Sequence, residues 1–280
     1  MIRSSRQLKA LVRNRAKGDS GKSQLLIRTF AMERFLERIS LSRYRNNFIL
    51  KGGILVSALV GLDSRTTMDI DTTLRYLPLS RESAERVVQE IIAVPVADNI
   101  RFVIKNISEI MDDTEYRGIR ISLDAHLETM RIPLKIDIST GDVITPAEIT
   151  YHYKLMFEDR FISLWAYTVE TVLAEKIETI LSRALTNTRL RDFYDVYLLQ
   201  TEGVNIDNKV LSAAISATCR ERGSEEVLLD YEHILDELHE SLIMRRLWQN
   251  YRQKNSYVRE IDWESAVSAV RHLCESCVPR

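Results

Sequence analysis

A period-two alternation of apolar and polar side chains recurs between residues 100 and 140, in the stretches RFVIKNISEI, GIRISLDAHL and RIPLKIDIS. Such alternation is typical of β-strands that bury one face. Two shorter apolar runs, NNFILKGG and TTMDIDTTL, come earlier, and segments with helical spacing separate the runs. Because strands and helices are interspersed, the sequence predicts an α/β (α+β) core with a small mixed sheet.

Both ends of the chain are predicted to be helical. Residues 1–47 are basic and read as helical, with a break at Gly18-Asp19-Ser20-Gly21. Beyond residue 151 five helical segments are expected, of which TVETVLAEKIETILSRAL is the strongest. We therefore expect the N-terminal helical lead-in and the core in one domain, 1–150, and a mostly helical C-terminal half in a second domain, 151–280.

Composition limits the partners that the chain can bind. Hydrophobic residues make up 45% of the 280 residues and charged residues 28%, so the chain can bury a core. The net charge is -1, so any contact with nucleic acid needs a local basic patch. Such a patch is available before residue 33, where Asp19 is the only acid among eight cations.

Several features favour a cytoplasmic protein without membrane contact. The first residues lack the apolar stretch of a secretion signal, and no apolar run is long enough to span a bilayer. The cysteines Cys219, Cys274 and Cys277 are too few for a disulfide framework, and a structural zinc site would need four ligands.

Two carboxylates share one face of a predicted strand. In TTMDIDTTL, Asp69 and Asp71 point the same way and Ile70 points to the other side, because alternate side chains of a strand share a face. Neighbouring carboxylates repel each other, and a divalent cation relieves that conflict; oxygen ligands suit Mg²⁺ or Mn²⁺. Asp137, in KIDI, supplies a third carboxylate if its strand lies beside the first. Such a cluster can hold two metals for a phosphoryl transfer.

Paired glycines precede this strand. Gly52 and Gly53 stand between an apolar run and a short predicted helix. The backbone N–H groups of such a turn form an anion cradle, and the missing side chains allow a triphosphate to approach. Alone, a Gly-Gly pair usually marks only a turn, and an Asp-x-Asp pair is common on solvated strand faces. Their order and spacing, with Asp137 on a later strand, make the combination more specific.

A lysine interrupts the apolar stripe of the strongest predicted helix. Lys176 lies four residues from both Val172 and Ile180, so its ammonium group needs a partner or a path to water. One interpretation is a buried stem with a solvated head; the other is a lysine that points into a cleft and contacts phosphate. In RLRDFYDVYLLQ, Asp192 and Asp195 share a helix side, and Asp192 is expected nearer the apolar face.

The motifs KGG, SRTTMDID, KIDI, AEK and RDFYDVY, in this order, resemble the AbiEii-type toxin nucleotidyltransferases, a branch of the polymerase-β-like superfamily. The resemblance covers roughly residues 25–200. It implies a nucleotidyltransferase core in which Asp69 and Asp71 bind metal and in which Gly52 and Gly53 hold the phosphates of a nucleotide.

The resemblance also implies roles for side chains outside the sheet. The superfamily usually has Gly-Ser at the turn, so a hydroxyl contact to phosphate must come from elsewhere, and Thr67 and Ser57 are the candidates. The lysine of the AEK helix is functional in the family, which favours a phosphate contact for Lys176. The RDxxD segment belongs to the family's active site, and we expect Asp192 rather than Asp195 to orient the lysine or to act as a base.

The function that this resemblance implies is transfer of a nucleotide from an NTP to an RNA acceptor, in particular the 3′ end of tRNA, which would block translation and arrest growth. The cofactor would be Mg²⁺ or Mn²⁺, and an antitoxin would be a partner. The alternatives are a small-molecule nucleotidyltransferase of the aminoglycoside-modifying kind and a nucleotide-binding regulator without turnover. The sequence leaves open which NTP and which RNA are used.

Overall fold

The computed structural model describes residues 1–110 and 118–278, and it contains two compact units. The first unit consists of Met1–Ala58, Thr66–Gly141 and Ile149–Ala166. The second consists of Leu59–Arg65, Asp142–Glu148 and Tyr167–Arg280.

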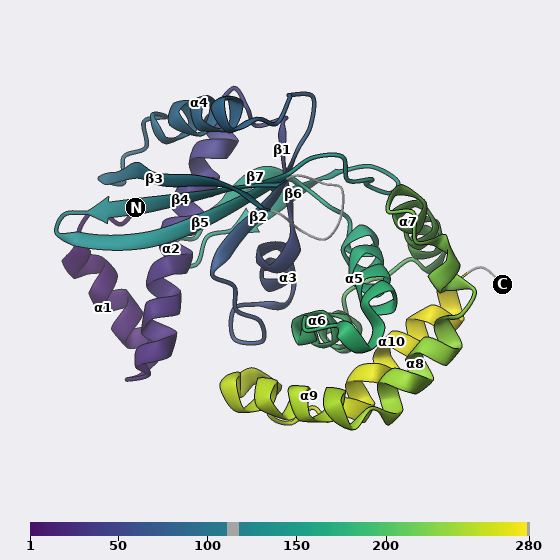
Figure 1. Cartoon of the computed structure of the whole chain (residues 1–280). Coiled ribbons are helices and arrows are strands. Elements are labelled where there is room, and N and C mark those ends of the chain that lie inside the picture. Colours follow the sequence, from purple (N-terminus) through teal and green to yellow (C-terminus); the bar gives the residue numbers. More distant parts are fainter. Residues whose placement is uncertain (111–117, 279–280) are drawn as a thin grey trace. The chain divides into compact units, whose positions relative to one another are not determined.

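A mixed seven-stranded sheet forms the centre of the first unit, with the strand order β3-β4-β5-β2-β1-β7-β6 (Figure 1). The strands are β1 (Phe48–Lys51), β2 (Asp69–Leu74), β3 (Ile100–Ile110), β4 (Gly118–Leu127), β5 (Met130–Ser139), β6 (Ile149–Lys154) and β7 (Phe161–Ala166). Two neighbouring pairs, β2 with β5 and β1 with β7, run parallel, and the other pairs run antiparallel. The predicted mixed α/β core is therefore confirmed.

Four helices begin in the first unit: α1 (Ser5–Ala16), α2 (Ser20–Leu41), α3 (Gly52–Val60) and α4 (Arg81–Ile92). The predicted break between the first two is confirmed. The cap residue Lys17 adopts a left-handed conformation, and the carboxylate of Asp19 then accepts the Lys22 N–H at the start of α2.

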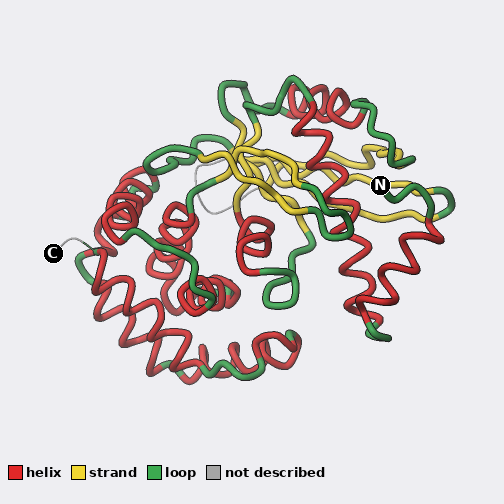
Figure 2. The backbone as a smooth tube through the Cα atoms, turned by 180° about the vertical axis from the view of Figure 1, so that it is seen from behind, coloured by secondary structure: helices red, strands yellow, loops and turns green. Residues whose placement is uncertain are grey.

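The two faces of the sheet differ in what covers them. Phe35 of α2 packs edge-on against Phe102 of β3, with ring centroids 5.9 Å apart. Phe102 of β3 pairs with Ala125 of β4, which pairs with Ile132 of β5, so these three side chains share one face of the sheet. The helix α2 therefore covers the face on which Ile132 and the other isoleucines of β5 lie. Figures 1 and 2 show α3 on the other side of the sheet from α4.

The second unit is helical. Its helices are α5 (Val169–Arg183), α6 (Leu190–Thr201), α7 (Asn208–Glu221), α8 (Tyr231–Glu240), α9 (Leu242–Lys254) and α10 (Trp263–Cys277), with short 3-10 helices η1 (Ala184–Thr186), η2 (Glu225–Leu228) and η3 (Ser256–Val258). Trp263 of α10 joins α6 to α9, because its ring centroid lies 4.8 Å from that of Phe193 and 5.7 Å from that of Trp248.

The division of the chain differs from the predicted boundary at residue 150. The first unit continues to Ala166, because β6 and β7 complete the sheet through the pairing of β7 with β1. We expected this stretch to belong to the helical half. Its two strands are short, and the strand that pairs with β7 lies more than a hundred residues earlier in the chain, so the sequence gives little sign that they join the sheet. In the described parts of the chain, no helix is both long enough and apolar enough to cross a membrane.

Candidate active site

A row of four charged residues crosses one face of the sheet. Asp71 of β2 pairs with Asp137 of β5, and the next partners outward are Arg120 on β4 and Lys51 on β1. Cross-strand partners share a face, so the row has the order cation, carboxylate, carboxylate, cation. The strand of Asp137 thus lies beside the strand of Asp69 and Asp71, as the prediction of a third carboxylate required.

The opposite face of the same strands is apolar, as predicted. Ile70 and Ile136, which are cross-strand partners, are fully buried. The alternation of the strands therefore places the aspartates on the face that α2 does not cover.

Arg120 holds Asp137 in a two-pronged ion pair. Its Nε and Nη2 donate to the two carboxylate oxygens of Asp137 at 2.8 and 2.6 Å. Planar guanidinium and carboxylate groups favour this geometry. The hydrogen bond and the charge of Asp137 raise the pKa of Arg120, so the arginine stays charged.

The glycine turn lies directly against Asp71. The backbone N–H of Gly53 donates to Asp71 Oδ2 at 3.1 Å. Gly52 has a φ of +62°, and a Cβ at that position would lie 2.4 Å from the same oxygen. Only glycine allows both the left-handed backbone and this close approach. The turn therefore binds a carboxylate through its amide, which is the donor geometry expected of an anion cradle.

Asp71 holds a proton more tightly than an ordinary aspartate does. Burial raises its pKa to about 6, and the charge of Asp137 acts in the same direction. The Gly53 N–H and the charge of Lys51 oppose the shift, and Asp69 adds to it. The predicted conflict between neighbouring carboxylates is therefore present at this position.

Asp69 and Thr67 precede Asp71 along the chain. Asp69 lies on the same face as Asp71 and pairs with Lys135 across the sheet. The Thr67 hydroxyl is buried and donates to the backbone carbonyl of Asp69 at 3.3 Å. A phosphate contact by Thr67 stays a prediction, since its hydroxyl has a local acceptor here.

Asp69 and Asp71 fit a divalent cation. Magnesium is commonly held by one or two carboxylates together with substrate phosphates, and a cation would relieve the conflict at Asp71. Each oxygen of Asp137 accepts one hydrogen bond from Arg120, so a cation at Asp137 would compete with that guanidinium. Within residues 1–110 and 118–278, no three His, Cys, Asp or Glu side chains are grouped so as to hold a metal. The metal role of Asp69, Asp71 and Asp137 stays a prediction.

The second unit has an ion cluster of its own. Lys176 of α5 is buried, and its ammonium group lies 2.6 Å from Asp192 Oδ1 and 2.7 Å from Asp195 Oδ2 of α6. Arg65 is also buried and binds both oxygens of Asp195, at 2.6 and 3.1 Å. The interpretation of Lys176 as a solvated head is wrong, because its head is buried against two carboxylates.

Charge balance keeps this cluster ionised. Burial by itself would lower the pKa of Lys176, but the two aspartates outweigh it and the pKa is raised. Burial would raise the pKa of Asp195, but Lys176 and Arg65 lower it to about 2. We expected Asp192 to lie nearer the apolar face, but Asp195 is the more buried of the two. The Asp195 side chain is 0% exposed and that of Asp192 is 15% exposed. Both bind Lys176, and the role of Asp192 in the reaction stays a prediction.

Sequence reasoning missed two arginines. Arg120 lies on β4, and only the pairing of β4 with β5 brings it next to Asp137. Arg65 lies in the SRTTMDID motif, a few residues before Asp69 and Asp71. Its place in that motif could have marked it as a candidate site residue.

Other candidate features proved structural. Cys219, Cys274 and Cys277 are free thiols in buried positions. Trp248 is only 1% exposed, so its ring is unavailable for stacking on a base.

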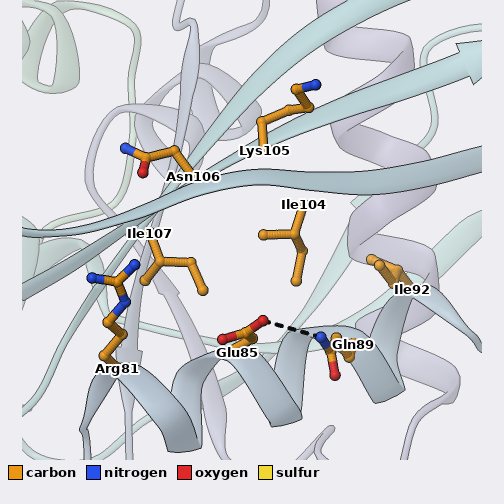
Figure 3. A pocket seen from close by; sticks show the side chains of 8 residues that line it. All are labelled: Arg81, Glu85, Gln89, Ile92, Ile104, Lys105, Asn106 and Ile107. Carbon is orange, nitrogen blue, oxygen red and sulfur yellow. Dashed lines mark hydrogen bonds between the residues drawn. The ribbon is translucent and has the colours of Figure 1, made fainter.

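A groove on the first unit lies apart from the predicted residues. It has a volume of about 410 Å³ and runs between α4 and β3 (Figure 3). Arg81, Glu85 and Gln89 line one side and Lys105 the other, and Gln89 donates to Glu85 across one helical turn. None of the predicted site residues lines this groove.

Two solved structures share the fold. One is a protein from Helicobacter pylori described as a nucleotidyltransferase, with 16% identity and a TM-score of 0.51 over 90% of this chain and 93% of that chain. The other is JHP933 from Helicobacter pylori, also with 16% identity and a TM-score of 0.51, over 90% of each chain. At this identity the likeness shows the fold. No curated protein sequence matches the chain.

A family model connects the fold to an activity. The model described as nucleotidyl transferase AbiEii toxin, type IV TA system, matches residues 34–269, which is well over half of the chain. The match includes the glycine turn, the aspartates of the sheet and the ion cluster around Lys176. The chain therefore belongs to the AbiEii family of nucleotidyl transferase toxins of type IV toxin–antitoxin systems, and it is a nucleotidyltransferase.

Proposed function

We propose that this nucleotidyltransferase moves a nucleotide from an NTP to an RNA acceptor, the 3′ end of a tRNA, and that the modified tRNA stops translation and growth. The observation that supports nucleotidyl transfer is the pairing of Asp71 with Asp137 beside the Gly53 amide. It combines carboxylates for a cation with a backbone donor for phosphate. An antitoxin is the partner that the family implies, and the cytoplasm is where NTP and tRNA are available.

The residues of the sheet have separate tasks in this proposal. Asp69 and Asp71 would hold Mg²⁺ or Mn²⁺. When bound, such a cation supplies positive charge against the triphosphate and the attacking oxygen. The amide of Gly53, which donates to Asp71 Oδ2 in the free protein, would turn to a phosphate oxygen when the NTP binds. Gly52 keeps the approach open because it has no side chain.

The reaction is a single displacement. The acceptor hydroxyl oxygen forms a bond to the α-phosphorus, the bond from that phosphorus to the bridging oxygen breaks, and pyrophosphate leaves. The hydroxyl proton passes to a carboxylate base. Asp192 is the residue that we assign either to this proton transfer or to orienting Lys176, which it binds at 2.6 Å. Lys176 is assigned to a phosphate contact, with Thr67 as a second candidate.

The test is transfer of label to RNA. Purified protein is incubated with Mg²⁺, total RNA and each α-labelled NTP in turn, alongside Asp69→Asn and the control Asp159→Asn, which changes an exposed aspartate of the same unit. We expect label on a tRNA-sized band with the wild type and the control but not with Asp69→Asn. Unchanged labelling by Asp69→Asn would refute the metal assignment. Folded protein that labels an aminoglycoside but no RNA would establish the small-molecule alternative, and NTP binding without pyrophosphate release would establish the regulator.

A further inference from the structure

The first helix carries a row of exposed cations. Arg6, Lys9 and Arg13 of α1 lie at spacings of three and four residues, so they fall within about 60° of the helix circumference. Lys17 follows directly at the cap. All four side chains are exposed. We call these four residues the basic stripe.

The basic stripe is only partly neutralised by the rest of the protein. Within residues 1–110 and 118–278, Arg6, Arg13 and Lys17 have no side-chain ion pair. Hydrogen bonds from Ser5 lower the pKa of Glu128, and the charge of Lys9 contributes in the same direction. Eight cations and one acid give residues 1–32 a net charge of +7, whereas the whole chain has -1. The one acid, Asp19, is used as the cap of α2.

The side of α1 next to the basic stripe is buried. Leu8, Val12 and Ala16 repeat at every fourth residue and are at most 4% exposed. They pack α1 against α2, and Figures 1 and 2 show the two helices side by side. The helix is therefore held in place by its apolar side, and the exposed cations project from a fixed backbone.

We infer that the basic stripe binds the phosphate backbone of the RNA acceptor; this inference rests on the proposed function, which makes RNA the acceptor. Among the described residues, Arg6, Arg13 and Lys17 lack acidic partners, as is expected of cations that contact a phosphate backbone. Membrane binding by an amphipathic helix would need an exposed apolar face, and here that face is buried. A protein interface would need an apolar centre, which the stripe also lacks. The stripe precedes residue 34, so it lies outside the part of the chain that the family model matches.

Binding without turnover tests this inference. Fluorescently labelled bulk tRNA is titrated with full-length protein in EDTA, without NTP, between 50 and 200 mM salt. The variant R6Q/K9Q/R13Q/K17Q is compared with the control R81Q/R86Q/R101Q/K105Q, which removes four exposed cations elsewhere in the first unit. Each lost phosphate contact reduces the slope of log K against log salt by about 0.7–0.9. We therefore expect the stripe variant to lose about 3 units of slope and the control to keep the wild-type slope.

The outcomes separate this inference from the proposed function. A stripe variant with the wild-type slope and affinity overturns the inference even if tRNA is labelled in the transfer assay. Conversely, stripe-dependent binding of tRNA by the wild type, together with a failure of the wild type to label any RNA, supports the stripe and refutes the proposed transfer. Vesicles of phosphatidylcholine and phosphatidylglycerol, and polyglutamate, are titrated in parallel. Stripe-dependent binding to either of these, with none to tRNA, overturns the inference. A conservative variant, R6K/R13K, keeps both positive charges and is therefore expected to have the wild-type slope.

Discussion

Arg120 on β4 binds both carboxylate oxygens of Asp137 on β5, at 2.8 and 2.6 Å, and Asp137 is the cross-strand partner of Asp71. An internal cation thus neutralises one of two adjacent carboxylates. A divalent cation that uses Asp137 must compete with this guanidinium.

Replacement of Arg120 is expected to strengthen binding of divalent cations. In Arg120→Gln, Asp137 loses its charged partner and the row of carboxylates becomes more negative, so the affinity for Mn²⁺ should rise roughly tenfold, about 1.4 kcal/mol. Titration calorimetry of the nucleotide-free protein measures the affinity for Mn²⁺, with Arg101→Gln as the control for the loss of one positive charge. Weaker or unchanged Mn²⁺ binding by Arg120→Gln would show that Asp137 does not contribute to the cation site.

The glycine turn can be tested with a pair of variants matched in backbone conformation. Gly52 and Gly223 both have a φ of +62°, but a Cβ on Gly223 has no heavy atom within 4 Å, whereas one on Gly52 would overlap Asp71. Each alanine should cost about 1–2 kcal/mol of unfolding free energy for the left-handed backbone. Gly52→Ala should lose more, and it should also lose nucleotidyl transfer, because the Asp71 carboxylate must move. Urea unfolding and the labelling assay measure the two effects. Equal losses in both variants would mean that the contact with Asp71 is unimportant.

The two aspartates of α6 should differ in their effect on stability. Asp195 is the shared partner of two buried cations, so Asp195→Asn leaves Arg65 and Lys176 without full compensation and should cost about 3–5 kcal/mol. Asp192→Asn should cost about 1 kcal/mol, since Asp192 is partly exposed and Lys176 keeps Asp195. Urea unfolding at pH 7 measures both. A larger loss in Asp192→Asn would contradict the order of burial.

Glu33 is expected to make stability depend on pH. Burial raises its pKa from 4.5 to about 8, while the Met156 N–H, which donates to its Oε1 at 2.8 Å, acts in the opposite direction. Below pH 4.5 both the folded and the unfolded chain hold the proton, so there is no penalty. Between pH 4.5 and about 8 folding takes up a proton, and the free energy of unfolding falls by up to about 1.4 kcal/mol per pH unit.

The substitution that isolates this effect is Glu33→Gln, which keeps the acceptor for Met156 and removes the titration. Near pH 4.5 it should match the wild type in urea unfolding, and at pH 8 it should be more stable than the wild type. The control is Glu85→Gln on α4, which removes the carboxylate of another glutamate in the first unit. A difference between Glu33→Gln and the wild type that stays constant with pH would show that Glu33 does not carry the pH dependence.

Local patterns predicted much of the fold. The alternation in β3, β4 and β5 predicted their faces, because neighbouring side chains on a strand must point in opposite directions. The stripe in α5 predicted that Lys176 needs a partner, because burying an unpaired ammonium group is costly. The position of β6 and β7 was not predictable in this way, since their place in the sheet depends on β1, far away in the chain.

The sequence by itself determined which residues share a strand face or a helix side: Asp69 with Asp71, Asp192 with Asp195, and the cations of α1. These relations follow from the periods of the strand and the helix, which are local. Only the tertiary structure decided that Asp71 pairs with Asp137, that Arg120 holds Asp137, and that Arg65 joins Lys176 around Asp195. Strand order and register arise from contacts between distant segments, and a shift by one residue would turn every side chain of a strand to the other face. The chemistry of the candidate site depends on those distant pairings, because they bring its charges together.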